Sequence, residues 1–299
     1  MKNGLTISMI FEASSANYGE GFGNITTLKK ITRDNGEGYS YISRQALRYN
    51  MINQLGWDNT PVEGMGSGDK KVIQYQPAAS IEDYPEIDLF GYMKTIKGQG
   101  AKTRSAVVRL SNAVSLEPYY SDVDFLTNMG LASRIEEDNS IAQSEIHKAF
   151  YAYTVTIDLD CVGKEDKKVD EDKEAIEIPN AEKAKRVVEL LQTVAYLYRD
   201  IKGRRENLAP VFIAGGIYNR KCPFFENRFK LNKWNLDVDM IIETMANIKD
   251  DTEIGYVSGT FKNDKEIKES LNPKTVTQMM DSLCHKVEVA YEVAYNEGN

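Results

Sequence analysis

Apolar and polar side chains alternate along several stretches of this chain with the two-residue period of a β-strand. Near the start, Leu5, Ile7, Met9 and Phe11 alternate with polar residues, which predicts a half-buried strand. The alternation is most regular over 151–161, where aromatic and aliphatic side chains occupy one face and Ala, Thr and Asp the other. Residues 104–116 alternate in the same way, and 211–214 form a short apolar run. The pattern therefore predicts four strands.

Other segments repeat their apolar positions with the helical period of 3.6 residues. Ser43 is a good N-cap for a helix that runs to about Leu55. A second helix is predicted from Asn180, because the apolar residues of 184–198 share one face. The tail predicts a helix near 236–248, a strand near 254–261, and a last helix with Asn272 as cap and Pro273 in its first position.

Two excursions interrupt these elements. Residues 57–103 are rich in Gly, Pro and Asp and read as an irregular insertion, and 118–147 are acidic and weakly patterned. Without them the order is strand, helix, strand, strand, helix, strand. This is the order of the α+β ferredoxin-like fold, which the RNA-recognition fold shares. No internal repeat is visible, so we expect a single elaborated domain over 1–299.

Composition narrows the class of protein. The chain has 299 residues, 41% of them hydrophobic, which is ample for a core. No apolar run approaches the roughly 18 residues of a membrane span, and the first apolar stretch ends at Glu12, too short for a signal peptide. The three cysteines lie far apart and imply no disulfide framework. We expect a soluble, cytoplasmic protein that does not contact a membrane.

The net charge conceals a segregation of charges. Lysines and arginines number 37 and acids 45, a balance of −8 that argues against a simple nucleic-acid binder. Yet 97–111 carries four cations and no acid, and 220–233 carries five cations and one acid, while acids concentrate in 117–145 and 158–182. A locally basic surface on an acidic protein is therefore expected, and the acidic parts would limit indiscriminate binding.

Signals of catalysis are weak. His147 and His285 lie at no ligand spacing from another His or Cys, which argues against a zinc site. Cys284 adjoins His285, but neighbouring residues on a helix do not face each other. The glycines at 19, 21 and 23 and those of 64–68 fit neither nucleotide-loop pattern and read as flexible loops. We expect no cofactor and no catalytic residue.

Asp158 and Asp160 are a more convincing candidate for a metal ion than Asp237 and Asp239, which open a predicted helix where acids favour the helix dipole. Asp158 and Asp160 lie two residues apart on one face of a predicted strand, where two carboxylates could share a divalent cation. The alternative, which we favour, is the solvated end of a strand. A metal-dependent ribonuclease is the corresponding enzymatic alternative, and an acidic adaptor between proteins is a third.

The start of the helix at 43–55 is more informative. A helix N-terminus offers free backbone N–H groups to a phosphate, and Ser43, Arg44 and Gln45 would add donors. Arg44 and Arg48 lie one turn apart, beside the apolar face of the helix. They therefore face either a binding partner or an acid of the same chain, and both readings remain open here.

Five strings of residues resemble one protein family, and they occur in the family's order over most of the chain to about residue 230. The chain is similar to the DevR family of CRISPR-associated RAMP proteins, the backbone subunits of the type I-B Cascade complex. The strings are MIFEASSANYGEGFGN (Met9–Asn24), YISRQALRY (Tyr41–Tyr49), DLFGYM (Asp88–Met93), SAVVRLSNAVSLEPY (Ser105–Tyr119) and GGIYNR (Gly215–Arg220).

The resemblance implies an RNA-recognition-like palm at about 1–56, 104–117 and 148–299. Residues 57–103 would be the fingers and 118–147 the thumb. Copies would stack head to tail along one CRISPR RNA, beside other Cascade subunits, and grip its sugar–phosphate backbone without reading sequence. Each thumb would push out one guide base, leaving the others to pair with a target DNA strand, so that base pairing carries the specificity.

The resemblance also implies site residues. Ser43, Arg44, Gln45 and Arg48 would grip guide phosphates, Lys102 and Arg104 would line the same channel, Gly215 and Gly216 would let the backbone approach RNA, and Arg220 would add a cation. The Thr and Asp face of 151–161 favours backbone cradling over base stacking. Asp34 lies in a loop where related type III subunits carry a cleaving Asp, but type I backbone subunits are not nucleases, so no catalyst is implied.

Overall fold

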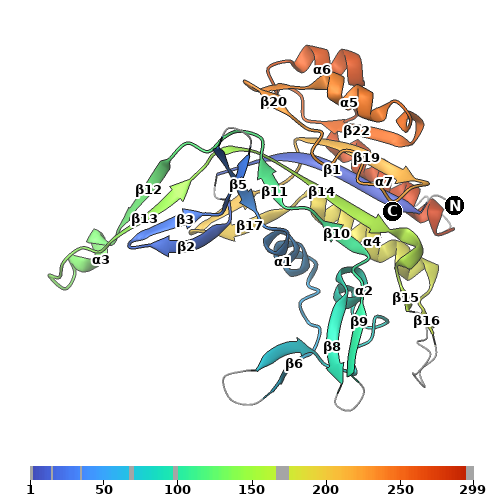
Figure 1. The fold of residues 1–299 in the computed structure, drawn as a ribbon, viewed down its shortest axis with the longest axis horizontal. Coiled ribbons are helices and arrows are strands. Elements are labelled where there is room, and N and C mark those ends of the chain that lie inside the picture. Colours follow the sequence, from blue (N-terminus) through green and yellow to red (C-terminus); the bar gives the residue numbers. More distant parts are fainter. Residues whose placement is uncertain are drawn as a thin grey trace.

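A computed structural model describes residues 3–14, 16–33, 36–66, 71–96, 100–165 and 175–293. Its centre is one antiparallel sheet, from which two β-rich segments project (Figure 1). The strand order is β22-β19-β1-β14-β11-β5-β4, with β10 also paired to β14. Their bounds are β1 Gly4–Ala13, β4 Lys30–Arg33, β5 Glu37–Ile42, β10 Val108–Leu110, β11 Ala113–Ser115, β14 Ala149–Asp158, β19 Phe212–Tyr218 and β22 Thr252–Tyr256.

Three helices cover one face of this sheet. They are α1 (Arg44–Leu55), α4 (Asn180–Ala195) and α7 (Val276–Ala290), and α4 contacts both of the others. The main core lies between these helices and the apolar face of β1 and β14, where Leu47, Leu190 and Leu283 are almost fully buried. The predicted helix at 43–55 is confirmed, with Ser43 as its N-cap.

Residues that follow β19 cover part of the opposite face. They form β20 (Leu231–Asn232), β21 (Asn235–Leu236), α5 (Val238–Met245) and α6 (Asp264–Leu271), which lie above the sheet in Figure 1. A second core around Phe150 and Phe212 fills this interface. Strand β1 is therefore buried on both faces, and its polar residue Ser8 meets Thr154 through a 2.6 Å hydroxyl–hydroxyl hydrogen bond. The expectation of a half-buried first strand was wrong, because the cover comes from a distant part of the chain.

The insertion over 57–103 is ordered into two hairpins and a short helix. Its elements are β6 (Val62–Met65), β7 (Val72–Tyr75), α2 (Pro85–Phe90), β8 (Tyr92–Ile96) and β9 (Gly100–Arg104), and they project below the sheet in Figure 1. Asp88 of α2 is fully buried and forms ion pairs with Arg104 and Arg186. The pair with Arg186 joins the insertion to α4. The insertion, which was predicted to be irregular, therefore contains regular elements that are held against the rest of the protein.

Residues 118–147 form most of a second projection, at the left of Figure 1. Strands β12 (Asp122–Thr127) and β13 (Ile141–Ile146) make a hairpin with the short helix α3 (Met129–Ala132) at its end. Strands β2 (Tyr18–Phe22) and β3 (Ile25–Leu28) extend it to four strands, which we call the arm. The glycines at 19, 21 and 23 thus belong to this hairpin, and Gly23 occupies its turn with φ of 61°.

Some predicted boundaries were wrong. The last helix begins after Thr275, whose side chain forms a capping box with Gln278, whereas Asn272 ends α6. The predicted strand at 151–161 ends at Asp158 in a short 3₁₀ turn, Leu159–Cys161. Further hairpins are β15 (Lys164–Glu165) with β16 (Ile176–Glu177), and β17 (Tyr198–Ile201) with β18 (Arg204–Asn207). In the described part of the chain, no helix is long and apolar enough to cross a membrane.

Candidate nucleic-acid interface

The first turn of α1 is fixed by side chains from two loops. The Ser43 hydroxyl donates to Oδ1 of Asn17 at 2.6 Å and accepts from the backbone N–H of Ala46 at 3.3 Å. The N–H of Ser43 also donates to Asn17, and that of Arg44 donates to Oδ1 of Asn112 at 2.9 Å. The backbone N–H groups of Arg44 and Ala46, which were predicted to be available to a phosphate, are thus used within the protein, and Ser43 acts as a cap that sets the position of the helix.

Two side chains on this turn remain directed to solvent. Arg44 and Gln45 are exposed, and Arg44 forms no ion pair with any described residue. Lys29 lies beside the same loop, because its N–H donates to the carbonyl of Asn17 and its carbonyl accepts from Tyr41. The sequence reasoning missed Lys29, which becomes recognisable only once β3 and β5 are seen to flank it. The result is a rigidly held cationic corner at the start of α1.

Arg48 faces the insertion instead of solvent. Its Nη2 lies 3.2 Å from the Tyr75 hydroxyl and 3.4 Å from Oε1 of Glu86, and its guanidinium lies 4.9 Å from the centre of the Phe90 ring. Burial and a hydrogen bond to Glu86 raise the pKa of Tyr75 to about 12, so its hydroxyl remains protonated. Of the two readings left open by the sequence, the structure shows the internal acid for Arg48 and the free surface for Arg44.

Lys102 and Arg104 are each paired with an acid of the same chain. The Arg104 side chain is only 8% exposed, and it meets Asp88 at 2.5 Å and the backbone carbonyls of Cys161 and Lys164. Lys102 forms an ion pair with Glu165 at 3.5 Å and is largely buried. The hydrogen bonds of Arg104 to Asp88, Cys161 and Lys164 hold β9 against the rest of the protein, so in this structure its guanidinium is directed into the protein.

Gly215 and Gly216 are buried in β19, between β1 and β22. A Cβ atom at Gly215 would lie 2.1 Å from the carbonyl oxygen of Thr6, and one at Gly216 would lie 1.9 Å from that of Asp251. The structure thus shows a close backbone approach at both glycines, and the groups that approach them are carbonyls of neighbouring protein segments.

Arg220 is exposed just after β19, and its chain neighbour Lys221 lines an open cavity of about 420 Å³. The cavity is lined by Arg109, Leu110, Ser111, Thr154, Thr156, Asp158, Lys221, Pro223 and Glu226. Arg109 meets Asp158 at 2.8 Å, and Lys221 meets Asp160 at 2.5 Å. The two carboxylates that could have shared a metal ion are therefore each paired with a cation. Among the described residues, no group of His, Cys, Asp and Glu side chains is suited to hold a metal.

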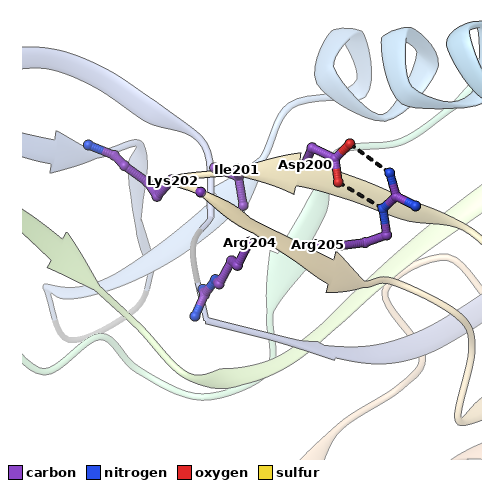
Figure 2. A pocket seen from close by; sticks show the side chains of 6 residues that line it. Asp200, Ile201, Lys202, Arg204 and Arg205 are labelled. Atoms are coloured by element: carbon purple, nitrogen blue, oxygen red, sulfur yellow. Dashed lines mark hydrogen bonds and ion pairs between the residues drawn. The ribbon is translucent and has the colours of Figure 1, made fainter.

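The turn between β17 and β18 forms a further basic surface, which the sequence reasoning missed (Figure 2). Arg205 pairs with Asp200 through two hydrogen bonds of 2.9 and 3.0 Å, while Lys202 and Arg204 point away from this pair. Lys202 donates to Ser144 of the arm at 3.0 Å and lies 4.7 Å from the centre of the Tyr18 ring. The signal was present as Lys-Gly-Arg-Arg at a turn.

The remaining residues singled out from sequence have structural roles or lie outside the described part. His147 is buried, and its Nδ1 lies 2.7 Å from the Ser40 hydroxyl. Burial lowers the pKa of His147, which favours its neutral form. His285 is exposed on α7 near Glu288. Asp34 falls outside the described residues.

Comparisons with known proteins agree on one family. The family model for the CRISPR-associated negative auto-regulator DevR/Csa2 matches residues 5–230. The curated CRISPR-associated protein Cas7/Cst2/DevR of Myxococcus xanthus (strain DK1622) is 28% identical in an alignment of 153 residues that covers 45% of this chain. The match spans 50% of that relative, so this chain covers about half of its length.

Two solved structures share the fold. One chain from a CRISPR RNA-guided surveillance complex in a pre-nicking state aligns with a TM-score of 0.60 and 11% identity, covering 95% of this chain and 100% of that one. A chain from a second CRISPR RNA-guided surveillance complex aligns with a TM-score of 0.54 and 13% identity, covering 95% and 99%. At these identities the likeness is one of fold.

Proposed function

Because this chain belongs to the DevR/Csa2 family of CRISPR-associated proteins, we propose that it is a non-catalytic backbone subunit of a type I CRISPR surveillance complex. It binds the sugar–phosphate backbone of the guide RNA in the cytoplasm, without reading sequence. The observation that carries this proposal is the corner at the start of α1. There, Arg44 and Gln45 are exposed on a turn that Asn17 and Asn112 hold in place.

A fixed cation suits this task because phosphates carry charge but no sequence information. Arg44 can donate two hydrogen bonds to one phosphate in a planar fork, and Lys29 and Arg220 add exposed or partly exposed charge. The balance of −8 over the whole chain would keep other polyanions away from the acidic surfaces.

The topology supports the division into palm, fingers and thumb. Strands β19, β1, β14 and β10 lie in the order expected of a ferredoxin-like sheet, with α1 and α4 on one face. The insertion over 57–103 would act as fingers and the arm hairpin over 118–147 as the thumb. Several apolar residues of this hairpin are exposed, including Phe125, Leu126 and Met129. A head-to-tail neighbour bound to the same guide would cover them.

We further propose that the subunit does not cut RNA, so that the guide stays intact and displays its bases to a target DNA strand. Asp158 and Asp160 support this, since Arg109 and Lys221 occupy the positions next to their carboxylates. Incubation with RNA and Mg²⁺ or Mn²⁺ checks the point. Intact RNA is expected, whereas cleavage that Asp158→Ala abolishes would make the protein a nuclease.

The binding site is tested by charge reversal. Arg44→Glu should weaken binding to unrelated RNA sequences by a similar factor and lower the salt dependence of binding. Lys265→Glu on α6 is the control, because it makes the same reversal of charge at an exposed lysine. If Arg44→Glu and Lys265→Glu bind RNA equally well, the start of α1 is not the guide site.

A further inference from the structure

A strained turn displays a tryptophan on the cover formed by residues after β19. The hairpin β20–β21 turns through Lys233 and Trp234, whose φ angles are 50° and 72°. This left-handed region is rarely adopted by residues other than Gly, Asn and Asp, and such strain often marks a functional position. The carbonyl of Trp234 accepts from the N–H of Lys262 at 2.9 Å, which fixes the turn.

The indole is held at one side and open at the other. Its ring lies edge-to-face with Phe150, with 5.4 Å between ring centres and 79° between planes. Trp234 is nevertheless 45% exposed, whereas the chain's other tryptophan, Trp57, is 7% exposed. A large aromatic side chain is thus kept in one orientation at the surface, although burial is usual for tryptophan.

Four cationic residues lie in this hairpin or in the chain segments next to it. Arg228, Lys230, Lys233 and Lys262 are exposed, and none forms an ion pair with a described residue. Nearby acids already have partners, since Asp237 accepts from the N–H of Met240 at 3.0 Å and Glu266 accepts from Asn263 at 2.8 Å. We call these four cations together with Trp234 the Trp234 surface.

We propose that the Trp234 surface binds a single-stranded nucleic acid, with one base stacked on the indole and adjacent phosphates against the cations. An extended polynucleotide supplies both a flat aromatic group and regularly spaced negative charge, which this surface matches. An acidic peptide would supply negative charge for the cations but no flat aromatic group to stack on the indole. The surface is distinct from the start of α1, and Trp234 lies beyond the residues that the family model matches.

Tryptophan fluorescence tests the proposal on the full chain without guide RNA. Oligodeoxythymidylate and oligouridylate of equal length are the probes, and the stronger binder identifies the preferred polymer. Both wild type and Trp234→Phe are titrated, because buried Trp57 contributes to both and the difference reports Trp234 alone. We expect quenching in wild type that is absent from Trp234→Phe.

Binding measured by fluorescence anisotropy of a labelled oligonucleotide then separates stacking from charge. Trp234→Ala should weaken binding about tenfold, within the range for loss of one stacked base, while Trp234→Phe retains most of the affinity. An abasic oligomer with the same phosphates should bind wild type as weakly as the normal oligomer binds Trp234→Ala. Replacing Lys230 and Lys233 with Gln should reduce the slope of log affinity against log salt by about 1.4, at about 0.7 for each phosphate contact.

Two results would overturn the proposal. Equal affinity of wild type and Trp234→Ala for the oligonucleotides would show that no base stacks on the indole. Stronger quenching of Trp234 fluorescence by polyglutamate than by oligonucleotides would show that the surface binds an acidic protein instead. Arg44→Glu is the control that separates this surface from the guide site. It should leave the quenching of Trp234 unchanged, so either site can fail without the other.

Discussion

Replacing Asp88 with Asn should loosen the insertion from the rest of the protein. The Asp88 carboxylate is fully buried, and its two oxygens accept from Arg104 at 2.5 Å, Arg186 at 2.9 Å and the N–H of Gly163 at 2.9 Å. The amide of Asn is neutral, and one of its two ends is a donor that would face a guanidinium. The substitution therefore removes the negative charge that the two buried arginines share, and Arg186 keeps its ion pair with Glu182 at 3.0 Å.

The expected cost follows from that loss. Breaking a buried ion pair by removing one partner typically costs about 3–5 kcal/mol. The loss should not exceed the upper end of this range, because both arginines keep hydrogen bonds to backbone carbonyls. Arg186 still donates to the carbonyls of Ile81 and Glu82, and Arg104 to those of Cys161 and Lys164. For a chain of this length, such a loss corresponds to a fall in melting temperature of about 5–8 °C.

Urea unfolding measures the free energy, and hydrogen exchange locates the effect. Asp83→Asn is the matched control, since Asp83 is exposed on the same segment. Faster exchange should appear in α2 and β9 of the Asp88 variant and not of the control. A loss below about 1 kcal/mol, or exchange that rises equally across the central sheet, would refute the reasoning that this carboxylate anchors the insertion.

Three further predictions follow from the same structure. Gly216→Ala should lower the free energy of unfolding by about 2–3 kcal/mol in urea titrations, because its Cβ would overlap the Asp251 carbonyl. Gly38→Ala should cost less than about 1 kcal/mol, because its Cβ would meet only the Lys30 side chain, at 4.0 Å, and equal losses would contradict the packing argument. Burial lowers the pKa of His147, so the contribution of this residue to the free energy of unfolding is complete above about pH 6.5. Below that pH the free energy of unfolding should fall by up to about 1.4 kcal/mol per pH unit. His147→Gln should flatten this fall when urea midpoints are measured against pH, and an unchanged profile would contradict the role given to His147. Arg48→Ala should lower the free energy of unfolding by about 1 kcal/mol through lost contacts with Glu86 and Phe90, while Arg44→Ala should change it by less than about 0.5 kcal/mol. A larger fall in melting temperature for Arg44→Ala than for Arg48→Ala would contradict the structural role of Arg48 and the exposed position of Arg44.

The sequence predicted the elements whose signal is local. The helix at 43–55 carries its cap and its apolar period in one stretch. The strand predicted at 151–161 alternates without interruption up to Asp158, where the observed strand ends. The start of the last helix was misplaced although its signal was also local. Thr275 and Gln278 have the spacing of a capping box, which competed with the more familiar Asn272–Pro273.

Charged side chains could not be assigned from the sequence, because their roles depend on partners far along the chain. In the sequence, Arg104 and Arg44 look equally suited to bind a phosphate. In the structure, Arg104 donates hydrogen bonds to Asp88 and to two distant carbonyls, whereas Arg44 remains exposed. Gly215 and Gly216 likewise follow the prediction of close approach, but only the sheet order reveals what approaches them. The exposure of Trp234 could not be predicted from the sequence, because it depends on how the residues after β19 cover the sheet.

The most direct test of the guide-binding proposal is the nucleic acid that co-purifies when the chain is expressed with a CRISPR array and its neighbouring genes. The proposal predicts RNA of discrete, uniform length, protected inside a particle that contains several copies of the chain and lost on Arg44→Glu. Protein that purifies without RNA and never joins such a particle would contradict it, and the likeness to surveillance-complex subunits would then be one of fold alone.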